Sequence, residues 1–230
     1  MAAARLDPDR VFCLVPARSG STRVRDKNLA LVGGTSLLER AVRVARAAVG
    51  RVFVSTDSDR YADVARRAGA EVPGLRPAAL AAADTPMDPV VAHALDAWAA
   101  DTVELVLVLQ PTAPFTTVDD LVAAVGAYDA SPAAACALTA VTVAPTTAFT
   151  LVAGPDGLAA PLVPALFDRR TQDVPPLANA TGAAFVAPAA RVRAGGPLVE
   201  APIALAFVDP ARAIDVDDEH DLARAREVAS

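Results

Sequence analysis

The 230-residue sequence predicts an α/β fold, with a mostly parallel, Rossmann-like sheet and helices on both of its faces. Short β-branched runs alternate with Ala-rich stretches, which is the pattern of strands joined by crossover helices. Hydrophobic residues make up 53% of the chain against only 12 Gly and 19 Pro, so low-complexity disorder and a collagen-like fibre are excluded. We therefore expect a single globular domain over residues 1–230.

The expected strands are continuous apolar runs, and the expected helices follow polar residues that can cap them. Strands are predicted at residues 11–15, 51–55, 104–109, 134–140 and 205–208. Helices are predicted at residues 36–49, 59–68, 88–99, 118–128 and 218–228. The first helix has the clearest start, because Ser36 is followed three residues later by Glu39, the signature of a capping box.

Regular alternation fails between residues 141 and 202, where prolines interrupt the chain repeatedly. These prolines are Pro145, Pro155, Pro161, Pro164, Pro175, Pro176, Pro188 and Pro197. We interpret residues 141–202 as an inserted subdomain that leaves the sheet. A subdomain of this kind is expected to cover the functional site or to contact a second subunit.

Charge and cysteine content restrict the partners. Twenty-one Lys and Arg against 27 Asp and Glu give a net charge of −6, which disfavours binding to nucleic acid or to an anionic membrane. Cys13 and Cys136 lie in separate apolar runs and are expected to be buried thiols, as in a reduced, cytoplasmic protein. No apolar signal segment or membrane-spanning run is visible, so no targeting is expected.

A basic loop directly after the first strand carries the densest chemistry. Residues 16–28, PARSGSTRVRDKN, contain Arg18, Arg23, Arg25 and Lys27 against one acid, a local charge of +3. Gly20 and the small hydroxyl residues beside it would let backbone N–H groups approach an anion, a combination that suits a polyphosphate. The loop matches neither GxxxxGK[ST] nor GxGxxG, and the alternative interpretation is a solvated basic turn.

Asp215 and Asp217 form a candidate metal site near the C-terminus. If this segment is extended, the two carboxylates point to one side, with backbones about 6 to 7 Å apart. Two carboxylates together with substrate phosphates suit Mg²⁺. The alternative is that Asp217 or Asp218 caps the last helix, which leaves Asp215 without a role. For Asp57, which follows the second strand, we favour a helix-capping role over one facing a ligand.

The wording of the basic loop resembles the PARxGSK…KN signature of the acylneuraminate cytidylyltransferases, and further motifs follow in that family's order. They are Ser55-Thr56-Asp57, Leu75-Arg76-Pro77 with Leu80-Ala81 and Asp84, His93-Ala94-Leu95, Leu109-Gln110-Pro111-Thr112-Ala113-Pro114, Arg170 with Gln172-Asp173 and Pro175, Gly182-Ala183, and Ile214-Asp215-Val216-Asp217. The resemblance covers about residues 11 to 228. Each motif is weak alone, but their common order is specific.

The resemblance implies transfer of CMP from CTP to the anomeric hydroxyl of a nonulosonic, sialic-acid-like keto sugar acid, with release of pyrophosphate and help from Mg²⁺. It implies a homodimer in which residues 141–202 supply the contact. The residues implied on the nucleotide side are Ala17, Arg18, Ser19, Gly20, Ser21, Arg23, Lys27, Asn28 and Arg76. Those implied on the acceptor side are Gln110, Thr112, Arg170, Gln172 and Thr181, with Asp215 and Asp217 as metal ligands.

Four residues, at three places in the chain, depart from the family pattern. Thr22 stands where the loop usually has Lys, Phe115 and Thr116 replace the residues that follow the LQPTSP motif, and Thr181 stands where Asn usually precedes Gly-Ala. The acceptor-side changes leave open a cytidylyltransferase for Kdo or for a small phosphonate. Thr22 leaves open a catalytically weak nucleotide-binding paralogue.

Overall fold

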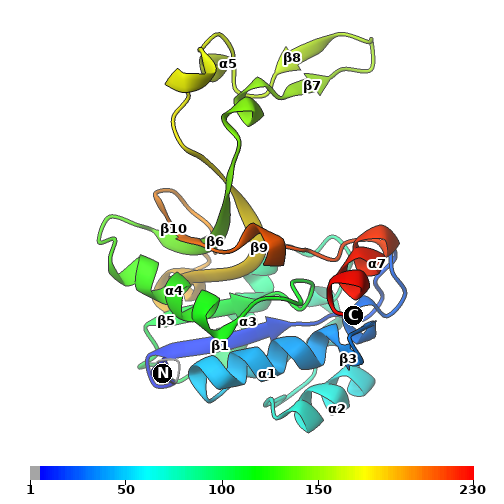
Figure 1. The fold of residues 1–230 in the computed structure, drawn as a ribbon. Coiled ribbons are helices and arrows are strands. Elements are labelled where there is room, and N and C mark those ends of the chain that lie inside the picture. Colours follow the sequence, from blue (N-terminus) through cyan, green and yellow to red (C-terminus); the bar gives the residue numbers. More distant parts are fainter. Residues whose placement is uncertain (1–5) are drawn as a thin grey trace.

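The computed structural model describes residues 6–230 and confirms the α/β fold. A six-stranded sheet has the order β10-β6-β9-β5-β1-β4 (Figure 1). Its strands are β1 (Val11–Pro16), β4 (Phe53–Ser55), β5 (Leu105–Leu109), β6 (Cys136–Val143), β9 (Leu177–Pro188) and β10 (Ile203–Phe207). Strand β1 is parallel to β4 and β5, and β10 is parallel to β6.

Helices cover both faces of the sheet, as the alternating pattern predicts. Helices α1 (Leu37–Val49), α2 (Asp59–Ala68) and α4 (Val118–Asp129) contribute to one hydrophobic cluster, which includes alternate residues of β1 and β5. Helix α3 (Met87–Trp98) and the short α6 (Ala189–Arg193) pack against the other face. Every helix and strand expected from the sequence is present, with ends displaced by a few residues.

The last helix, α7 (Glu219–Val228), closes a smaller cluster beside the basic loop. Its buried residues Leu222 and Ala225 pack with Val24 of the loop and with Val32 of the β2–β3 hairpin, whose strands are β2 (Leu31–Val32) and β3 (Thr35–Ser36). The C-terminal end of the chain is therefore attached to the loop after β1. No helix within residues 6–230 is long and apolar enough to cross a bilayer.

The expected excursion from the sheet over residues 141–202 is wrong in its extent. Residues Leu177–Pro188 form β9, which pairs antiparallel with both β5 and β6 and so lies in the middle of the sheet. The apolar half of this strand, AAFVA, is preceded by Asn179, Thr181 and Gly182, which do not read as a strand. Pairing with neighbours on both sides compensates for the weak local preference.

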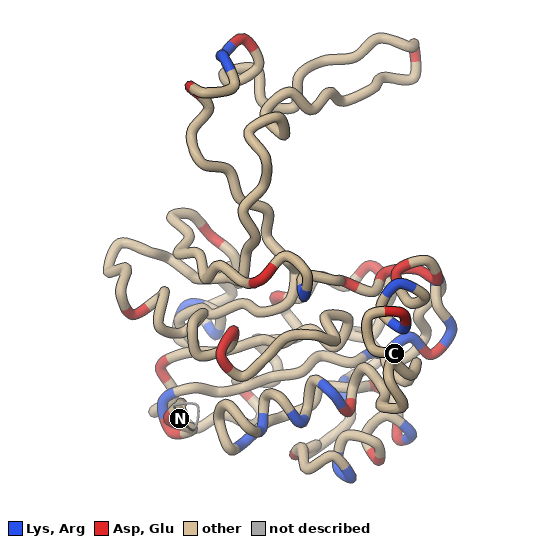
Figure 2. The backbone as a smooth tube through the Cα atoms, viewed as in Figure 1, with Lys and Arg blue, Asp and Glu red and all other residues tan. Residues whose placement is uncertain are grey.

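The segment that leaves the sheet is residues 144–176, which we call the arm. It rises from the ends of β6 and β9 and holds the hairpin of β7 (Leu151–Ala153) and β8 (Ala159–Pro161), followed by the single turn α5 (Pro164–Phe167) (Figure 1). Figure 2 shows that the arm has few charged positions, whereas acidic and basic positions are frequent along the backbone near α7 and the basic loop.

Candidate active site

A cavity of about 190 Å³ lies at the carboxyl ends of β1 and β5. Ligands of open α/β sheets bind at this edge. The residues expected from the sequence that line the cavity together are Arg18, Ser21, Arg23, Lys27, Asn28, Arg76, Gln110, Thr112 and Asp217. Thr85, Met87 and Val90 also line it, and sequence reasoning missed them because small and apolar residues at the start of a helix carry no motif.

Two of the backbone N–H groups expected to face an anion are already used within the protein. The N–H of Ala17 donates to the carbonyl of Ser55, 2.9 Å away, because the β1–β4 pairing continues by one residue. Ser19 donates both its N–H and its hydroxyl to the carboxylate of Asp57, at 2.7 and 2.6 Å. Ala17 and Ser19 therefore use their N–H groups to shape the loop and leave anion contact to its other residues.

The same contact corrects the helix-capping role favoured for Asp57. The N-cap of α2 is Ser58, and the side chain of Asp57 points instead to the loop after β1. Burial opposes ionisation of Asp57, but the two hydrogen bonds from Ser19 outweigh it and hold the pKa below its usual range. An ionised Asp57 thus stabilises the start of the loop.

Arg18 and Asn28 fix the two ends of the loop against each other. The amide Nδ2 of Asn28, a buried residue, donates to the carbonyl of Arg18 at 3.1 Å. The Arg18 guanidinium bends back over the carbonyls of Ser19 and Gly20, at 3.3 and 3.2 Å. Gly20 makes this bend possible, because its φ of +69° lies in the left-handed region.

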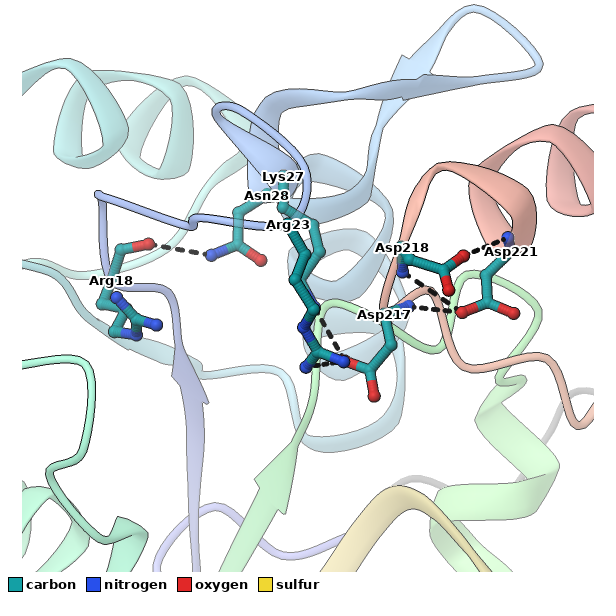
Figure 3. A network of polar contacts seen from close by, with 7 residues as sticks. All are labelled: Arg18, Arg23, Lys27, Asn28, Asp217, Asp218 and Asp221. Carbon is teal, nitrogen blue, oxygen red and sulfur yellow. Dashed lines mark hydrogen bonds and ion pairs between the residues drawn. The ribbon is translucent and has the colours of Figure 1, made fainter.

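The cations of the loop meet a carboxylate from the far end of the chain. One oxygen of Asp217 accepts from Lys27 Nζ at 3.0 Å and from Arg23 Nη2 at 3.1 Å (Figure 3). The Lys27 side chain is only 14% exposed, whereas that of Arg23 is 65% exposed. The site therefore holds two cations around one acidic group, with Arg23 at the rim.

The structure separates the two roles considered for the C-terminal acids. Asp218 is the N-cap of α7, accepting from the N–H groups of His220 and Asp221, and Asp221 returns a capping-box contact. The backbone N–H of Asp217 also donates to Asp221, 3.0 Å away (Figure 3). Capping thus falls to Asp218, and the Asp217 carboxylate is turned to the cavity.

Asp215 lies on the same short segment, with alternate residues Ile214 and Val216 buried beneath it. The N–H of Val216 donates to the carbonyl of Thr112, which ties the segment to the loop after β5. Gly182 allows a close approach, because its φ is +72° and a Cβ there would lie 3.2 Å from an oxygen of Asp215. The Gly-Ala motif of β9 therefore makes room for this carboxylate.

Asp215 is exposed at the surface, but its surroundings shift the pKa of its carboxyl upward. Desolvation raises its pKa above the usual range, the charge of Asp217 raises it further, and a hydrogen bond from Thr112 and the charge of Lys27 oppose the rise. Within residues 6–230, no three His, Cys, Asp or Glu side chains gather to hold a metal ion. Asp215 and Asp217 supply two carboxylates on one short segment, so a cation held there would take its remaining ligands from water and phosphate oxygens.

Arg76 forms the inner wall of the cavity and is 6% exposed. Its Nε donates to the hydroxyl of Ser55 at 3.0 Å and its Nη2 to the carbonyl of Ser55 at 2.7 Å. Desolvation lowers its pKa to about 10, against the favourable charge of Asp57. A buried guanidinium still charged at neutral pH can attract an anion or donate to a polar ring.

The expected acceptor-side residues do not gather at one place. Gln110 and Thr112 line the cavity, and the N–H of Gln110 donates to Ala183 of β9. The hydroxyl of Thr181 contacts that of Thr139 at 2.6 Å and lines a separate small cavity beside Arg212. Arg170 lies on the arm, 74% exposed and paired with Asp173, and no residue of 144–176 lines the main cavity.

Comparison with known proteins places these observations in a family. A segment of 110 residues is 37% identical to the CMP-N,N'-diacetyllegionaminic acid synthase of Legionella pneumophila, covering 46% of this chain and 47% of that protein. A segment of 65 residues is 48% identical to the 3-deoxy-manno-octulosonate cytidylyltransferase of Xanthobacter autotrophicus, covering 28% of this chain and 26% of that protein. The chain thus matches less than half the length of these curated relatives.

A solved structure of CMP:2-keto-3-deoxy-manno-octonic acid synthetase complexed with CTP has the same fold. Its TM-score is 0.72 at 16% sequence identity, over 95% of this chain and 98% of that one. The model of one protein family, described as Cytidylyltransferase, matches residues 12–175, which is more than half of the chain and includes the basic loop, Arg76 and Gln110. The chain belongs to the cytidylyltransferase family.

Proposed function

We propose that this protein is a CTP-dependent cytidylyltransferase acting on a nonulosonic, sialic-acid-like keto sugar acid. The anomeric hydroxyl oxygen forms a bond to the α-phosphorus of CTP, the bond to the β-phosphate oxygen breaks, pyrophosphate leaves, and the hydroxyl proton is released. The observation that carries the proposal is the meeting of Arg23 and Lys27 with Asp217, in a cavity that Arg18 also lines. Cations at this place neutralise a triphosphate.

The chain's own residues account for nucleotide binding. Arg23 and Lys27 exchange the carboxylate of Asp217 for phosphate oxygens, and Arg18 turns from the loop carbonyls to a phosphate. Arg76 lies deeper in the cavity, where a buried, charged donor suits the polar edge of the cytosine ring. Positioning and charge neutralisation are the main requirements of phosphoryl-type transfer, so a covalent intermediate is unnecessary.

Asp215 and Asp217 are the residues that would hold Mg²⁺. When bound, Mg²⁺ neutralises the charge that develops on the transferring phosphate and the leaving pyrophosphate. Lys27 and Arg23 both contact one oxygen of Asp217, so a nucleotide that draws these cations to its phosphates would free this carboxylate. Nucleotide and metal are therefore expected to favour each other's binding.

The proposed class of acceptor rests on the curated relatives that the chain resembles. The longer match, to a CMP-N,N'-diacetyllegionaminic acid synthase, supports a nonulosonic acid. The match to a 3-deoxy-manno-octulosonate cytidylyltransferase supports Kdo as the alternative acceptor. In both cases the acceptor is a keto sugar acid that offers an anomeric hydroxyl and a carboxylate.

A homodimer would complete the acceptor side. The arm presents Leu151, Val152, Leu158 and Leu162, all more than half exposed, on residues 151–162, where Asp156 is the one charged residue. Figure 2 shows how few charged positions the arm has. Burial of these side chains against a second copy would remove apolar surface from water. It would also bring Arg170 and Gln172 of one chain toward the cavity of the other.

The proposal is tested by release of pyrophosphate from CTP, UTP and ATP, each with a nonulosonic acid and with Kdo in the presence of Mg²⁺. We expect release with CTP alone among the nucleotides and with the nonulosonic acid as the better acceptor. Release with Kdo only would replace the acceptor. Absence of release with CTP and every acceptor would contradict the activity and favour a nucleotide-binding paralogue.

A further inference from the structure

The basic loop is attached at two points to one short stretch of the chain, the junction of β4 and α2. Asp57 accepts two hydrogen bonds from Ser19 near the start of the loop. Arg60 and Tyr61, one turn later, contact Asp26 near its end. Asp57, Arg60 and Tyr61 thus hold positions seven residues apart, and we call them the brace.

Asp26 is the part of this arrangement that the backbone makes unusual. Its φ of 51° and ψ of 38° are left-handed, and it is the one non-glycine residue with positive φ within residues 6–230. Such a conformation is unfavourable for most non-glycine residues and persists where its surroundings maintain it. Asp26 is thus held in this geometry by contacts that its neighbours supply.

The contacts come from a charged and a neutral donor. Arg60 Nη1 donates to one carboxylate oxygen of Asp26 at 2.9 Å, and the Tyr61 hydroxyl donates to the other at 3.2 Å. The Tyr61 ring is buried in the main core, at 1% exposure, so its hydroxyl has a fixed position. Arg60 lowers the pKa of Asp26, which keeps the carboxylate ionised.

The turn at Asp26 determines where the next residues point. The carbonyl of Asp26 accepts from the N–H of Leu29 at 2.7 Å, which starts the short 3₁₀ turn Lys27–Leu29. Asp26 faces α2, whereas Lys27 reaches Asp217 and Asn28 reaches the Arg18 carbonyl on the cavity side. A change at Asp26 would therefore move both cavity residues.

We propose that Asp57, Arg60 and Tyr61 are positioning residues, which hold Ser19 and Asp26 so that the loop is preformed for the CTP phosphates. None of the three is among the residues that line the cavity. Their role is to reduce the ordering cost of nucleotide binding, since a preformed site loses less conformational entropy when its ligand arrives. The part of this proposal that concerns CTP rests on the proposed function.

The brace itself is tested without any ligand, by hydrogen–deuterium exchange of peptides covering residues 17–29. Asp57→Asn, Arg60→Gln and Tyr61→Phe are compared with the matched controls Asp59→Asn and Arg67→Gln on α2, whose side chains are exposed. We expect the loop to exchange faster than in the wild type in the three brace variants, and at the wild-type rate in the two controls. Arg60 is exposed and Tyr61→Phe removes one oxygen, so these variants keep the fold.

Asp26 variants separate the side chain from the backbone. Asp26→Gly satisfies the left-handed conformation but removes the carboxylate, whereas Asp26→Asn keeps an oxygen for Tyr61 and tolerates positive φ. We expect the loop to exchange as fast in Asp26→Gly as in Arg60→Gln. In Asp26→Asn, the loop should exchange at a rate between that of the wild type and that of Asp26→Gly. Wild-type exchange in Asp26→Gly would overturn the brace, because the backbone alone would then suffice.

Calorimetry with CTP then measures the consequence for binding. We expect each brace variant to weaken CTP affinity by about tenfold, as for loss of charge-assisted contacts that preform a site, and to raise KM with little change in kcat. Unchanged affinity in all three, despite faster loop exchange, would overturn the positioning role. Failure of the wild-type protein to bind CTP would instead contradict the proposed function, with the exchange result unaffected.

Discussion

The two halves of the expected site differ in how the chain holds them. On the nucleotide side, Ser19, Asn28, Asp57 and Asp217 are tied by hydrogen bonds between segments as far apart as the loop after β1 and the start of α7. On the acceptor side, Arg170 lies on the arm, and its one ion pair is with Asp173, three residues away. The residues expected on the nucleotide side are therefore tied together within one chain, whereas those expected on the acceptor side are divided between the cavity and the arm.

Under the proposed function, this contrast assigns nucleotide affinity to the scaffold and acceptor specificity to the arm. Groups held by a rigid scaffold lose little entropy when a ligand binds, so the nucleotide side is suited to constant recognition of one substrate. The arm continues from the ends of β6 and β9 and lies outside the sheet, where segments generally tolerate more sequence variation than the core does. The following experiments challenge that division.

The largest effect on turnover is expected for the two candidate metal ligands, Asp215 and Asp217. Asp215→Asn or Asp217→Asn should lower turnover by about a hundredfold or more, because charge stabilisation at the transferring phosphate is lost. Steady-state pyrophosphate release in Mg²⁺ measures this. The control is Asp218→Asn, which preserves the N-cap of α7 and should keep most activity. Full activity in both the Asp215 and the Asp217 variant would contradict the assignment of these residues as metal ligands.

The loop cations should come next. Arg18→Ala and Lys27→Ala each remove a charge-assisted contact of roughly 1.5 to 3 kcal/mol, so CTP affinity should fall by about tenfold or more. Acceptor KM should change little if the halves are independent. Titration calorimetry with CTP decides the point, and an unchanged dissociation constant would return the loop to the role of a solvated basic turn.

Arg170→Ala tests the other half. We expect a rise of about tenfold in acceptor KM, as for loss of a guanidinium–carboxylate contact, with CTP affinity at the wild-type value. Light scattering at micromolar concentration should show a dimer for both proteins. Arg169→Ala, on the same turn of the arm, is the control. A monomer, or an Arg170→Ala variant with normal acceptor kinetics, would contradict the division of the acceptor side between two chains.

A smaller difference is expected between neighbours in the loop. Arg23 pairs with Asp217 and lines the cavity, so Arg23→Ala should reduce turnover more than Thr22→Ala does. Thr22→Lys should give little gain, because Arg23 already supplies the cation that the family carries one residue earlier. If Thr22→Lys strongly activates the enzyme while Arg23→Ala has no effect, the compensation idea is wrong.

The smallest effect concerns alkaline pH. Burial and the Asp26 carboxylate raise the pKa of Tyr61 to about 12, above its usual value of about 10. Because the folded protein favours the neutral phenol, this stabilisation is present below about pH 10 and is lost as pH approaches about 12. Urea unfolding between these pH values should show a steeper loss of stability in the wild type than in Tyr61→Phe. An equal dependence of unfolding free energy on pH in the two proteins would contradict the raised pKa of Tyr61.

The fold is predicted well from the sequence because most of its helices and strands have a clear local sequence pattern. The runs around Val11 and Leu105 are apolar over the length of a strand, and Ser36 with Glu39 forms a recognisable helix start. Strand β9 was missed because its first half contains Asn179 and Gly182, and its pairing is with strands on both sides. Tertiary context overrides such weak local preference.

The sequence predicts many of the residues that line the cavity, but not the contacts between them, and Arg170 and Thr181 lie elsewhere. The basic loop and Asp217 were expected on chemical grounds, yet the pairing of Lys27 with Asp217 joins residues 190 positions apart, for which a single sequence holds no signal. The helix-capping role predicted for Asp57 is wrong, because an Asp after a strand is equally suited to capping a helix and to hydrogen bonding with a nearby loop. Only the direction of the side chain distinguishes these roles.

The central position of β9 has a consequence for how the chain reaches this structure. Strands β1, β4 and β5 can pair as soon as residue 109 is available, but β6 joins them only through β9, which lies beyond the arm. Until residue 188 has been made, β5 presents an open edge of continuous apolar sequence, a surface prone to pairing with other chains. Folding of the sheet is thus gated by a late, non-local step, so synthesis that pauses within the arm exposes the nascent protein to aggregation.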